Sequence, residues 1–322
     1  MQKVTDKEFI QAWEKHKSPS KVANAIGLSV RSTYARRRSI EAKGLLNLES
    51  GPRLQDLQDT RQASHQNPAR VHCGVENGTV IVFSDAHFWS DYNKTTFKGL
   101  LWAIKELKPK IVIANGDIFD GAQVSRHPRI GWDSTPSVIE ELKACEAALG
   151  EIEEAAISAR RNTKLIWTLG NHDARFENML AANAPQYQFV KGFSLKDHFP
   201  AWQPCWSCWP TENVVIKHRF KGGIHATHNN TLWAGKSMVT GHLHSLKVTP
   251  FSDYNGTRFG VDTGTLAEVG GSQFINYLED APVNWRSGFA ILTFFNGKLL
   301  WPELVHKWGE NQVEFRGQII NV

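Results

Sequence analysis

The 322-residue chain has little cysteine, no long apolar run and no repeated segment. Four cysteines in a chain of this length are too few for a disulfide scaffold, which favours a reducing compartment such as the cytoplasm. No stretch reaches the roughly 18 apolar residues that a membrane-spanning helix needs, so we expect no membrane partner. The first residues, MQKVTDKEFIQAWEKHK, lack the apolar core of a secretory signal, which again favours a cytoplasmic location.

Positive charge is unevenly distributed along the chain. Residues 1–50 contain ten lysines and arginines against five acidic residues, a balance of +5, which equals the balance of the whole chain. Residues 51–322 are therefore neutral overall. A compact basic segment joined to a neutral body is typical of a module that binds a polyanion, most often nucleic acid.

The basic segment, residues 1–46, is predicted to be helical, with two short helices separated by a turn. Ser18 is followed by proline, which is a good helix start. Gly27 can take the left-handed conformation that ends this helix, and Ser29 can cap the next one. With the small Ala23 where the two helices would cross, the segment resembles a helix-turn-helix, which implies contacts with duplex DNA.

On this resemblance the second helix supplies the DNA contacts. Polar side chains near its start would face base edges, and the arginine run would contact phosphates. The base-facing candidates are Arg31, Ser32 and Thr33, and the phosphate candidates are Arg36, Arg37 and Arg38. The alternative is a small helical bundle whose arginines form an ordinary solvated surface.

The rest of the chain shows an α/β pattern. Residues 47–77 are rich in Gln, Asp, Ser, Asn and Pro, so we interpret them as a linker to a second domain, residues 78–322. The expected strands of that domain lie at 79–83, 111–114, 165–169, 214–216 and 237–240, and the expected helices at 95–107 and 136–160. After residue 257 the chain has strand signals alone.

Each expected strand ends in residues that can bind a metal ion. The five strand ends read Ser-Asp-Ala-His, Asn-Gly-Asp, Gly-Asn-His-Asp, a single His, and Gly-His-Leu-His. Ligands bind beyond the carboxyl ends of the strands in open α/β sheets, so these side chains would converge. The candidate metal ligands are Asp85, His87, Asp117, Asn171, His218, His242 and His244. Gathering them without neutralisation would be costly, and seven such ligands are too many for one ion and fit two.

In this order the five blocks resemble the calcineurin-like metallophosphoesterase superfamily, over about residues 78–270. The resemblance implies a four-layer α/β/β/α sandwich preceded by the small all-α module. It implies that one metal takes Asp85, His87, Asp117 and His244, and that the other takes Asp117, Asn171, His218 and His242. We expect two divalent ions, with Mn²⁺ as first choice and Fe, Zn or Mg as alternatives.

The single-histidine block has three candidates. His218 directly follows an expected strand, whereas His225 and His228 fall in an expected helix. The family often has a glycine directly after this histidine, where Arg219 stands here. We predict His218 as the ligand, with His225 as the alternative.

The resemblance also implies a reaction. A hydroxide that bridges the two ions would attack phosphorus, while the metals and Asn171 would stabilise the charge on the phosphate oxygens. His172 carries no metal in the family pattern, so it would protonate the leaving oxygen or stabilise its charge. Asp173 or Asp120 would orient the His172 imidazole.

Three further side chains are candidates for holding the substrate phosphate. Arg175 could bind it through two parallel hydrogen bonds, and the alternative is a surface ion pair with Glu177. His127 and Arg126 follow the second motif, and the alternative for both is an ordinary exposed loop.

The basic segment decides between substrate classes, because the chemistry at the metals is shared across the superfamily. We expect a DNA phosphodiesterase, a nuclease held on duplex DNA by its N-terminal module. The alternative is a phosphomonoesterase acting on phosphoproteins or small phosphate esters. Asp120 favours that alternative, since repair nucleases often have histidine there. A third hypothesis, a DNA-binding regulator without activity, is disfavoured because no ligand position is lost.

Overall fold

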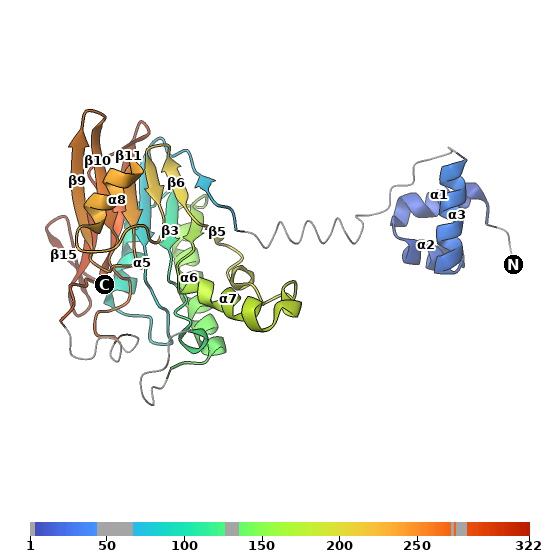
Figure 1. The fold of residues 1–322 in the computed structure, drawn as a ribbon, viewed down its shortest axis with the longest axis horizontal. Coiled ribbons are helices and arrows are strands. Elements are labelled where there is room, and N and C mark those ends of the chain that lie inside the picture. Colours follow the sequence, from blue (N-terminus) through green and yellow to red (C-terminus); the bar gives the residue numbers. More distant parts are fainter. Residues whose placement is uncertain (1–3, 44–66, 126–134, 272–273, 275–281) are drawn as a thin grey trace. The chain divides into compact units, whose positions relative to one another are not determined.

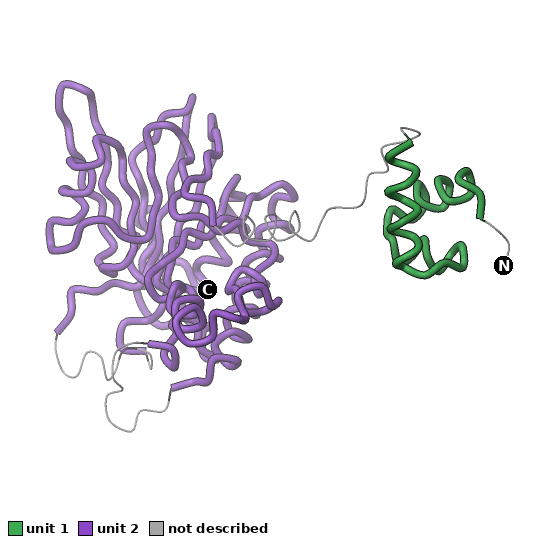
Figure 2. The backbone as a smooth tube through the Cα atoms, turned by 45° about the vertical axis from the view of Figure 1, so that its right-hand side comes forward, with its two compact units in different colours: residues 1–66 green, residues 67–322 purple. Residues whose placement is uncertain are grey.

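The computed structural model describes residues 4–43, 67–125, 135–271, 274 and 282–322 of the chain. The chain forms two compact units, Met1–Gln66 and Asn67–Val322 (Figure 2). Within the described residues, no helix is both long and apolar enough to span a membrane.

The first unit contains three helices, α1 (Asp6–His16), α2 (Pro19–Ile26) and α3 (Val30–Ala42). Their capping follows from the sequence. Thr5 and Glu8 form a capping box at the start of α1, and the Ser29 side chain accepts a hydrogen bond from the Ser32 backbone at the start of α3. Gly27 ends α2 with a φ of 68°. The core is small and consists of Phe9, Trp13, Val22 and Ile40.

The second unit contains two β-sheets. The smaller sheet has the spatial order β1 (Val71–His72), β6 (Cys208–Thr211), β7 (Val214–Ile216), β8 (Ser237–Thr240), β10 (Gly256–Asp262) and β9 (Lys247–Asp253). The larger sheet has the order β15 (Gln318–Asn321), β14 (Gln312–Phe315), β13 (Glu303–Gly309), β11 (Gly288–Phe295), β2 (Gly78–Phe83), β3 (Ile111–Asn115), β4 (Lys164–Thr168) and β5 (Gln203–Cys205), with β12 (Lys298–Leu299) paired to β11.

The helices of this unit cover the outer faces of the sheets (Figure 1). The α-helices are α5 (Thr95–Leu107), α6 (Val138–Ala159), α7 (Asp173–Asn183) and α8 (Ala226–Ala234), and the 3₁₀ turns are η1 (Ala122–Val124), η2 (Pro185–Tyr187) and η3 (Leu195–Asp197). Helices α5 and α6 pack on the larger sheet, and α8 packs on β8, β9 and β10 of the smaller sheet. The four-layer α/β/β/α sandwich is confirmed.

The alternation of side chains along β2 shows how the layers are built. Val80 and Val82 belong to the core between the two sheets, where they meet Val239 and Val261 of the smaller sheet. Ile81 and Phe83, which alternate with these valines, point to the opposite face of the sheet and pack in the core beneath the helices. Both faces of the strand are buried from Val80 to Phe83, which explains why this part of its sequence is apolar throughout.

The second unit begins earlier than the sequence predicts. Strand β1 pairs with β6, and Val75 is buried in the core between the sheets. Residues 67–77 are therefore part of the sandwich rather than of a linker. They lack the apolar periodicity of a strand because β1 lies at the edge of its sheet and spans two residues.

Candidate metal centre

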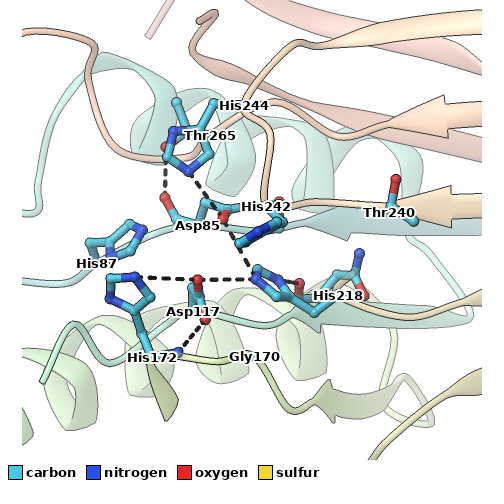
Figure 3. A network of polar contacts seen from close by, with 12 residues as sticks. Asp85, His87, Asp117, Gly170, His172, His218, Thr240, His242, His244 and Thr265 are labelled. Carbon is cyan, nitrogen blue, oxygen red and sulfur yellow. Dashed lines mark hydrogen bonds and ion pairs between the residues drawn. The ribbon is translucent and has the colours of Figure 1, made fainter. Parts of the chain in front are cut away.

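The predicted ligands come from strand ends of both sheets. Strands β2, β3 and β4 are neighbours in the larger sheet and run parallel, and β7 and β8 are parallel neighbours in the smaller one. Figure 3 shows Asp85, His87 and Asp117 facing His218, His242 and His244 across a common site. The packing of the two sheets thus brings together residues that lie far apart in the sequence.

The ligand positions have an unusual backbone conformation. Asp85, His87, Asp117, His242 and His244 all have a positive φ, between 43° and 73°. Such conformations are uncommon for residues other than glycine, and they cluster at functional sites. The strands turn sharply at these positions, and the turns aim the side chains at the site.

Among the described residues, three groups of side chains are close enough to hold a metal ion each. Asp85, His87 and His244 form the first group, and Asp117, His218 and His242 form the second. His87, Asp120 and His172 form the third, and the ligand atoms of each group lie within 4.8 Å of one another. His244 Nε2 lies 3.1 Å from Asp85 Oδ1, and His218 Nε2 lies 3.0 Å from Asp117 Oδ2. The first two groups contain part of the ligand sets that the family resemblance implies, without Asp117 in the first and without Asn171 in the second.

Asn171 also has a buried polar atom that is available to a metal ion. Its side-chain oxygen is buried and has no hydrogen-bond partner among the described residues. The next residue, His172, donates its backbone N–H to Asp117 Oδ1 at 2.8 Å, which places the Asn171 turn against the second group. An unpaired buried oxygen beside carboxylates and imidazoles fits a divalent cation, because such a cation accepts oxygen and nitrogen ligands together.

The electrostatics of the centre show that it favours a cation. Burial raises the pKa of Asp85, but the charges of His244 and His218 outweigh this and lower it to about 2. Asp117 likewise has a pKa below its usual range, because the charge of His218 outweighs burial. Burial lowers the pKa of His218, but Asp117 and Asp85 raise it to about 10. A proton on His218 thus offsets two buried carboxylates, and a metal ion would replace that proton.

His218 is held in position by its other ring nitrogen. Its Nδ1 lies 2.8 Å from the Asn115 carbonyl oxygen, which accepts the Nδ1 proton and leaves Nε2 directed at the site. His225, the alternative ligand, is exposed and precedes α8, and His228 packs against Phe251. Of the three candidates, the structure places only His218 in a group of potential ligands among the described residues.

Two glycines permit the close approach of the loops. A Cβ on Gly170 would lie 2.0 Å from Asp117 Oδ1, and a Cβ on Gly116 would lie 2.5 Å from the His218 ring. Both separations are impossible for real atoms, so a side chain at either position would displace the neighbouring ligand. The glycine that precedes Asp117 in the motif is therefore a packing requirement.

Asp173 does not orient His172, contrary to one of the two expectations. Its carboxylate accepts hydrogen bonds from the Trp167 indole and from the backbone N–H groups of Asp117, Ile118, Phe119 and Gly170. Burial and the neighbouring Asp117 charge raise its pKa. Asp173 is the first residue of α7, and its hydrogen bonds fix the backbone of the turn at Asp117, after β3. Its carboxylate does not contact the His172 imidazole in the described structure.

Asp120 has the orienting role. Its Oδ1 lies 2.9 Å from His172 Nδ1 and 3.0 Å from His87 Nδ1, so one carboxylate contacts both a candidate proton donor and a candidate metal ligand. Burial lowers the pKa of His172, and the hydrogen bond to Asp120 outweighs it and raises that pKa. A histidine at position 120 could not accept hydrogen bonds from both rings in this way.

Arg175 lies beside the same imidazole. It donates to the Asp120 carbonyl oxygen at 2.9 Å, and its Nη2 lies 3.1 Å from His172 Nε2. Glu177, its expected alternative partner, instead accepts from the Ser194 hydroxyl at 2.6 Å. Arg175 therefore adds positive charge to the site, whereas the candidates Arg126 and His127 lie outside the described residues.

Some residues that contact the candidate ligands are not among the predicted site residues. Ser84 donates its hydroxyl proton to Asp85 Oδ2, and the Thr265 hydroxyl donates to the Asp85 carbonyl oxygen at 2.7 Å. The Trp285 ring lies 4.4 Å from the His244 ring. The only sequence signal for Ser84 is its place before Asp85, and Thr265 looks like part of an ordinary turn.

The N-terminal unit presents only part of the predicted DNA-binding set. Thr33 is fully buried, and its hydroxyl donates to the Ser29 carbonyl oxygen at 3.0 Å, so it cannot contact a base. Position 33 faces the core because it lies on the same side of α3 as Ile40. Arg31, Ser32 and Arg38 are exposed.

The two remaining arginines of this set have partners within the unit. Arg36 pairs with Asp6 at 3.1 Å, and Arg37 pairs with Glu41 at 2.8 Å. The Arg37 guanidinium also lies over the Trp13 ring, 4.8 Å from its centroid. Both cations therefore contribute to the packing of α3 on α1 as well as to the surface charge.

A fold with two stacked sheets, and a cage of carboxylates, imidazoles and an amide at their strand ends, defines a metal-dependent phosphoesterase. The model of the calcineurin-like phosphoesterase family matches residues 78–263, and the chain belongs to that family.

The chain is similar to the gene 54 proteins of two mycobacterial phages. It is 24% identical to that of Mycobacterium phage L5 over 253 residues and 25% identical to that of phage D29 over 251 residues. These alignments cover 70% of this chain and 92% of each phage protein. Among solved structures, a novel archaeal phosphodiesterase matches 70% of this chain and 99% of its own, with 14% identity and a TM-score of 0.35.

Proposed function

We propose that this protein is a DNA phosphodiesterase, a nuclease whose N-terminal helical unit binds duplex DNA and holds the metal centre on its substrate. The observation that carries the proposal is the joining of the two parts in one chain. A metal centre of this kind could hydrolyse any class of phosphoester. Residues 1–50, however, carry the entire net positive charge of the chain, and the side chains of Arg31 and Arg38 are exposed, which favours a polyanionic substrate such as DNA.

The chain's own residues have distinct roles at the reacting phosphate. When bound, two divalent ions, Mn²⁺ as first choice, supply a water nucleophile of lowered pKa and a positive field for the phosphate oxygens. Asn171 adds an amide ligand, and Arg175 adds a guanidinium beside the site. His172, held through Nδ1 by Asp120, is positioned to give a proton to the leaving oxygen.

A substrate series tests the reaction. Purified protein with Mn²⁺ is given labelled DNA, bis-p-nitrophenyl phosphate and p-nitrophenyl phosphate, and metal content is measured in parallel. Turnover of DNA and the chromogenic diester supports the proposal. Turnover of the monoester alone supports a phosphomonoesterase, which the replacement of the nuclease histidine by Asp120 favours. No turnover by metal-loaded protein supports a DNA-binding regulator without activity.

A pair of matched variants tests the DNA tether. Arg31→Ala with Arg38→Ala removes two exposed positive charges from α3, and Lys15→Ala with Lys21→Ala removes two from α1 and α2. We expect the first pair to weaken duplex DNA binding about tenfold at moderate salt and to lower the slope of affinity against salt by about two. Equal losses in both pairs would indicate a non-specific charge effect and would exclude α3 as the recognition helix.

A further inference from the structure

A groove next to the candidate metal centre is lined in part by the segment that follows β7. Its volume is about 380 Å³, and its lining includes His242, a member of the second ligand group. Its lining also includes Lys217, Arg219, Phe220 and Lys221. The groove therefore contains one candidate ligand together with residues that the family motifs do not specify.

Three positive charges line this groove without a countercharge. Lys217, Arg219 and Lys221 form no ion pair with a carboxylate in the described part of the chain. Their segment is nevertheless fixed, because His218 within it is anchored to the Asn115 carbonyl and the Lys221 backbone N–H donates to the buried Asn230 side chain at 2.8 Å. Charges held together in this way attract an anion of matching extent.

Two aromatic rings lie beside these cations: Phe220 is in the groove lining, and Trp233 of α8 lies next to Lys221. The Phe220 side chain is 44% exposed and Trp233 of α8 is 70% exposed. Lys221 Nζ lies 5.7 Å from the Phe220 centroid and 4.5 Å from that of Trp233, and Lys217 Nζ lies 5.5 Å from that of Phe220. Exposed rings offer faces on which a planar partner such as a base can stack.

We propose that this groove binds an unpaired stretch of the DNA strand next to the phosphodiester being cleaved. Backbone phosphates bind Lys217, Arg219 and Lys221, and bases stack on Phe220 and Trp233. Alternating cations and exposed rings are the features with which proteins bind single strands, because every base has a face that can stack. A duplex keeps its base faces covered and can use only the cations. This inference rests on the proposed nuclease function and specifies the strand that the site takes.

A binding experiment tests the groove without relying on catalysis. The full chain is titrated in EDTA against a fluorescein-labelled six-nucleotide oligothymidylate, and anisotropy is measured at several salt concentrations. Phe220→Ala with Trp233→Ala is expected to weaken binding by about tenfold or more, because each base stack is lost. Arg219→Ala with Lys221→Ala is expected to weaken it about tenfold and to lower the salt slope by about one to two.

The control variant removes one exposed ring and one exposed cation elsewhere. Trp308 is 63% exposed on β13, and Lys105 is exposed on α5. Trp308→Ala with Lys105→Ala is expected to bind the oligonucleotide like the unmodified protein. The N-terminal unit is present in every variant, so its own contribution to binding is constant.

Two binding results would contradict the proposal that the groove binds an unpaired DNA strand. One is that the Phe220/Trp233 variant binds the oligonucleotide no more weakly than the control. The other is that a glutamate hexapeptide binds as tightly as the oligonucleotide and loses affinity equally in all groove variants, which would indicate an acidic protein partner.

Hydrolysis separates failure of the groove from failure of the proposed function. With Mn²⁺, the unmodified protein should prefer a single-stranded hexanucleotide to bis-p-nitrophenyl phosphate, as the ratio of kcat/KM values. Both groove variants should lower that ratio about tenfold. A metal-loaded protein that cleaves neither substrate would refute the nuclease, while the binding titration would still decide the groove. Cleavage of both substrates with an unchanged ratio would refute the groove alone.

Discussion

The two units of this chain place their candidate functional residues in opposite environments. In the N-terminal unit five of the six DNA-binding candidates are at least partly exposed on α3, and Thr33 is buried next to a core of four large side chains. In the phosphoesterase unit five of the seven candidate ligands are buried at strand ends of the two sheets, whereas Asn171 is half-buried and His242 is exposed. Many backbone hydrogen bonds fix the direction of a strand end in a sheet. On a short helix, by contrast, a shift of one position along the sequence moves a side chain from the core to the solvent.

That contrast explains where the interpretation of the sequence fails. Ser32 and Thr33 are neighbours of similar chemistry, yet one is exposed and the other is fully buried. Asp85 and His87, separated by one residue, both reach the site because positive φ values bend the chain there. The following experiments challenge this comparison, beginning with the largest expected effect.

Asp117→Ala should abolish most of the activity. Asp117 lies 3.0 Å from His218 and accepts the His172 backbone N–H, so its loss removes a metal ligand and loosens the Asn171 turn. We expect kcat for bis-p-nitrophenyl phosphate to fall about a thousandfold or more, since metal polarisation is worth several kcal/mol. Metal content by mass spectrometry should fall in parallel. Full activity in a variant that folds normally would remove Asp117 from the centre.

His172→Ala should lower activity about a hundredfold or more on DNA, the range expected for a lost general acid. The loss should be smaller for bis-p-nitrophenyl phosphate, whose leaving group needs no proton, and both metals should remain bound. Asp120→Asn should reproduce part of the DNA defect, because it weakens the hydrogen bond that orients the ring. An equal loss on both substrates would argue against proton transfer by His172.

The centre should make stability depend on pH and on metal together. Without metal, His218 has its pKa raised from 6.5 to about 10, so its contribution to stability is complete below pH 6.5 and is lost as pH rises towards 10. A metal ion must displace that proton, and its stabilising effect should therefore grow over the same interval. The Tm with Mn²⁺ minus the Tm in EDTA should increase from pH 6.5 to about 9. A difference that stays constant with pH would contradict the assignment, and His306→Ala on β13 serves as a control.

The smallest effect tests the correction in the N-terminal unit. Thr33→Val keeps the shape of a buried side chain but loses the hydrogen bond to Ser29, so we expect about 1 kcal/mol less stability for this unit. Duplex affinity in fluorescence titrations should change much less than in the Arg31/Arg38 variant. If Thr33→Val lost as much affinity for DNA as the arginine variant, without a loss of stability, Thr33 would have to belong to the DNA-binding surface.

The sequence permits the prediction of most of the sandwich because the central strands are buried on both faces. Strands β2, β3, β4, β7 and β8 have unbroken apolar runs, and their polar ends stand out against them. The edge strand β9 has no such signal, since it is half exposed and contains Pro250. Strand β15 is also an edge strand and is largely exposed, and β14 beside it has only four residues, of which two are buried.

The order of the motifs along the chain determines the kind of protein by itself, because ligand chemistry and spacing do not depend on how distant loops pack. Tertiary structure decides which groups meet. It directs Asp173 to the backbone beneath Asp117, gives Asp120 two histidines to orient, and builds a cationic, aromatic groove beside His242. These outcomes depend on contacts between segments far apart in sequence, and a linear pattern contains no information on the angle at which such segments approach.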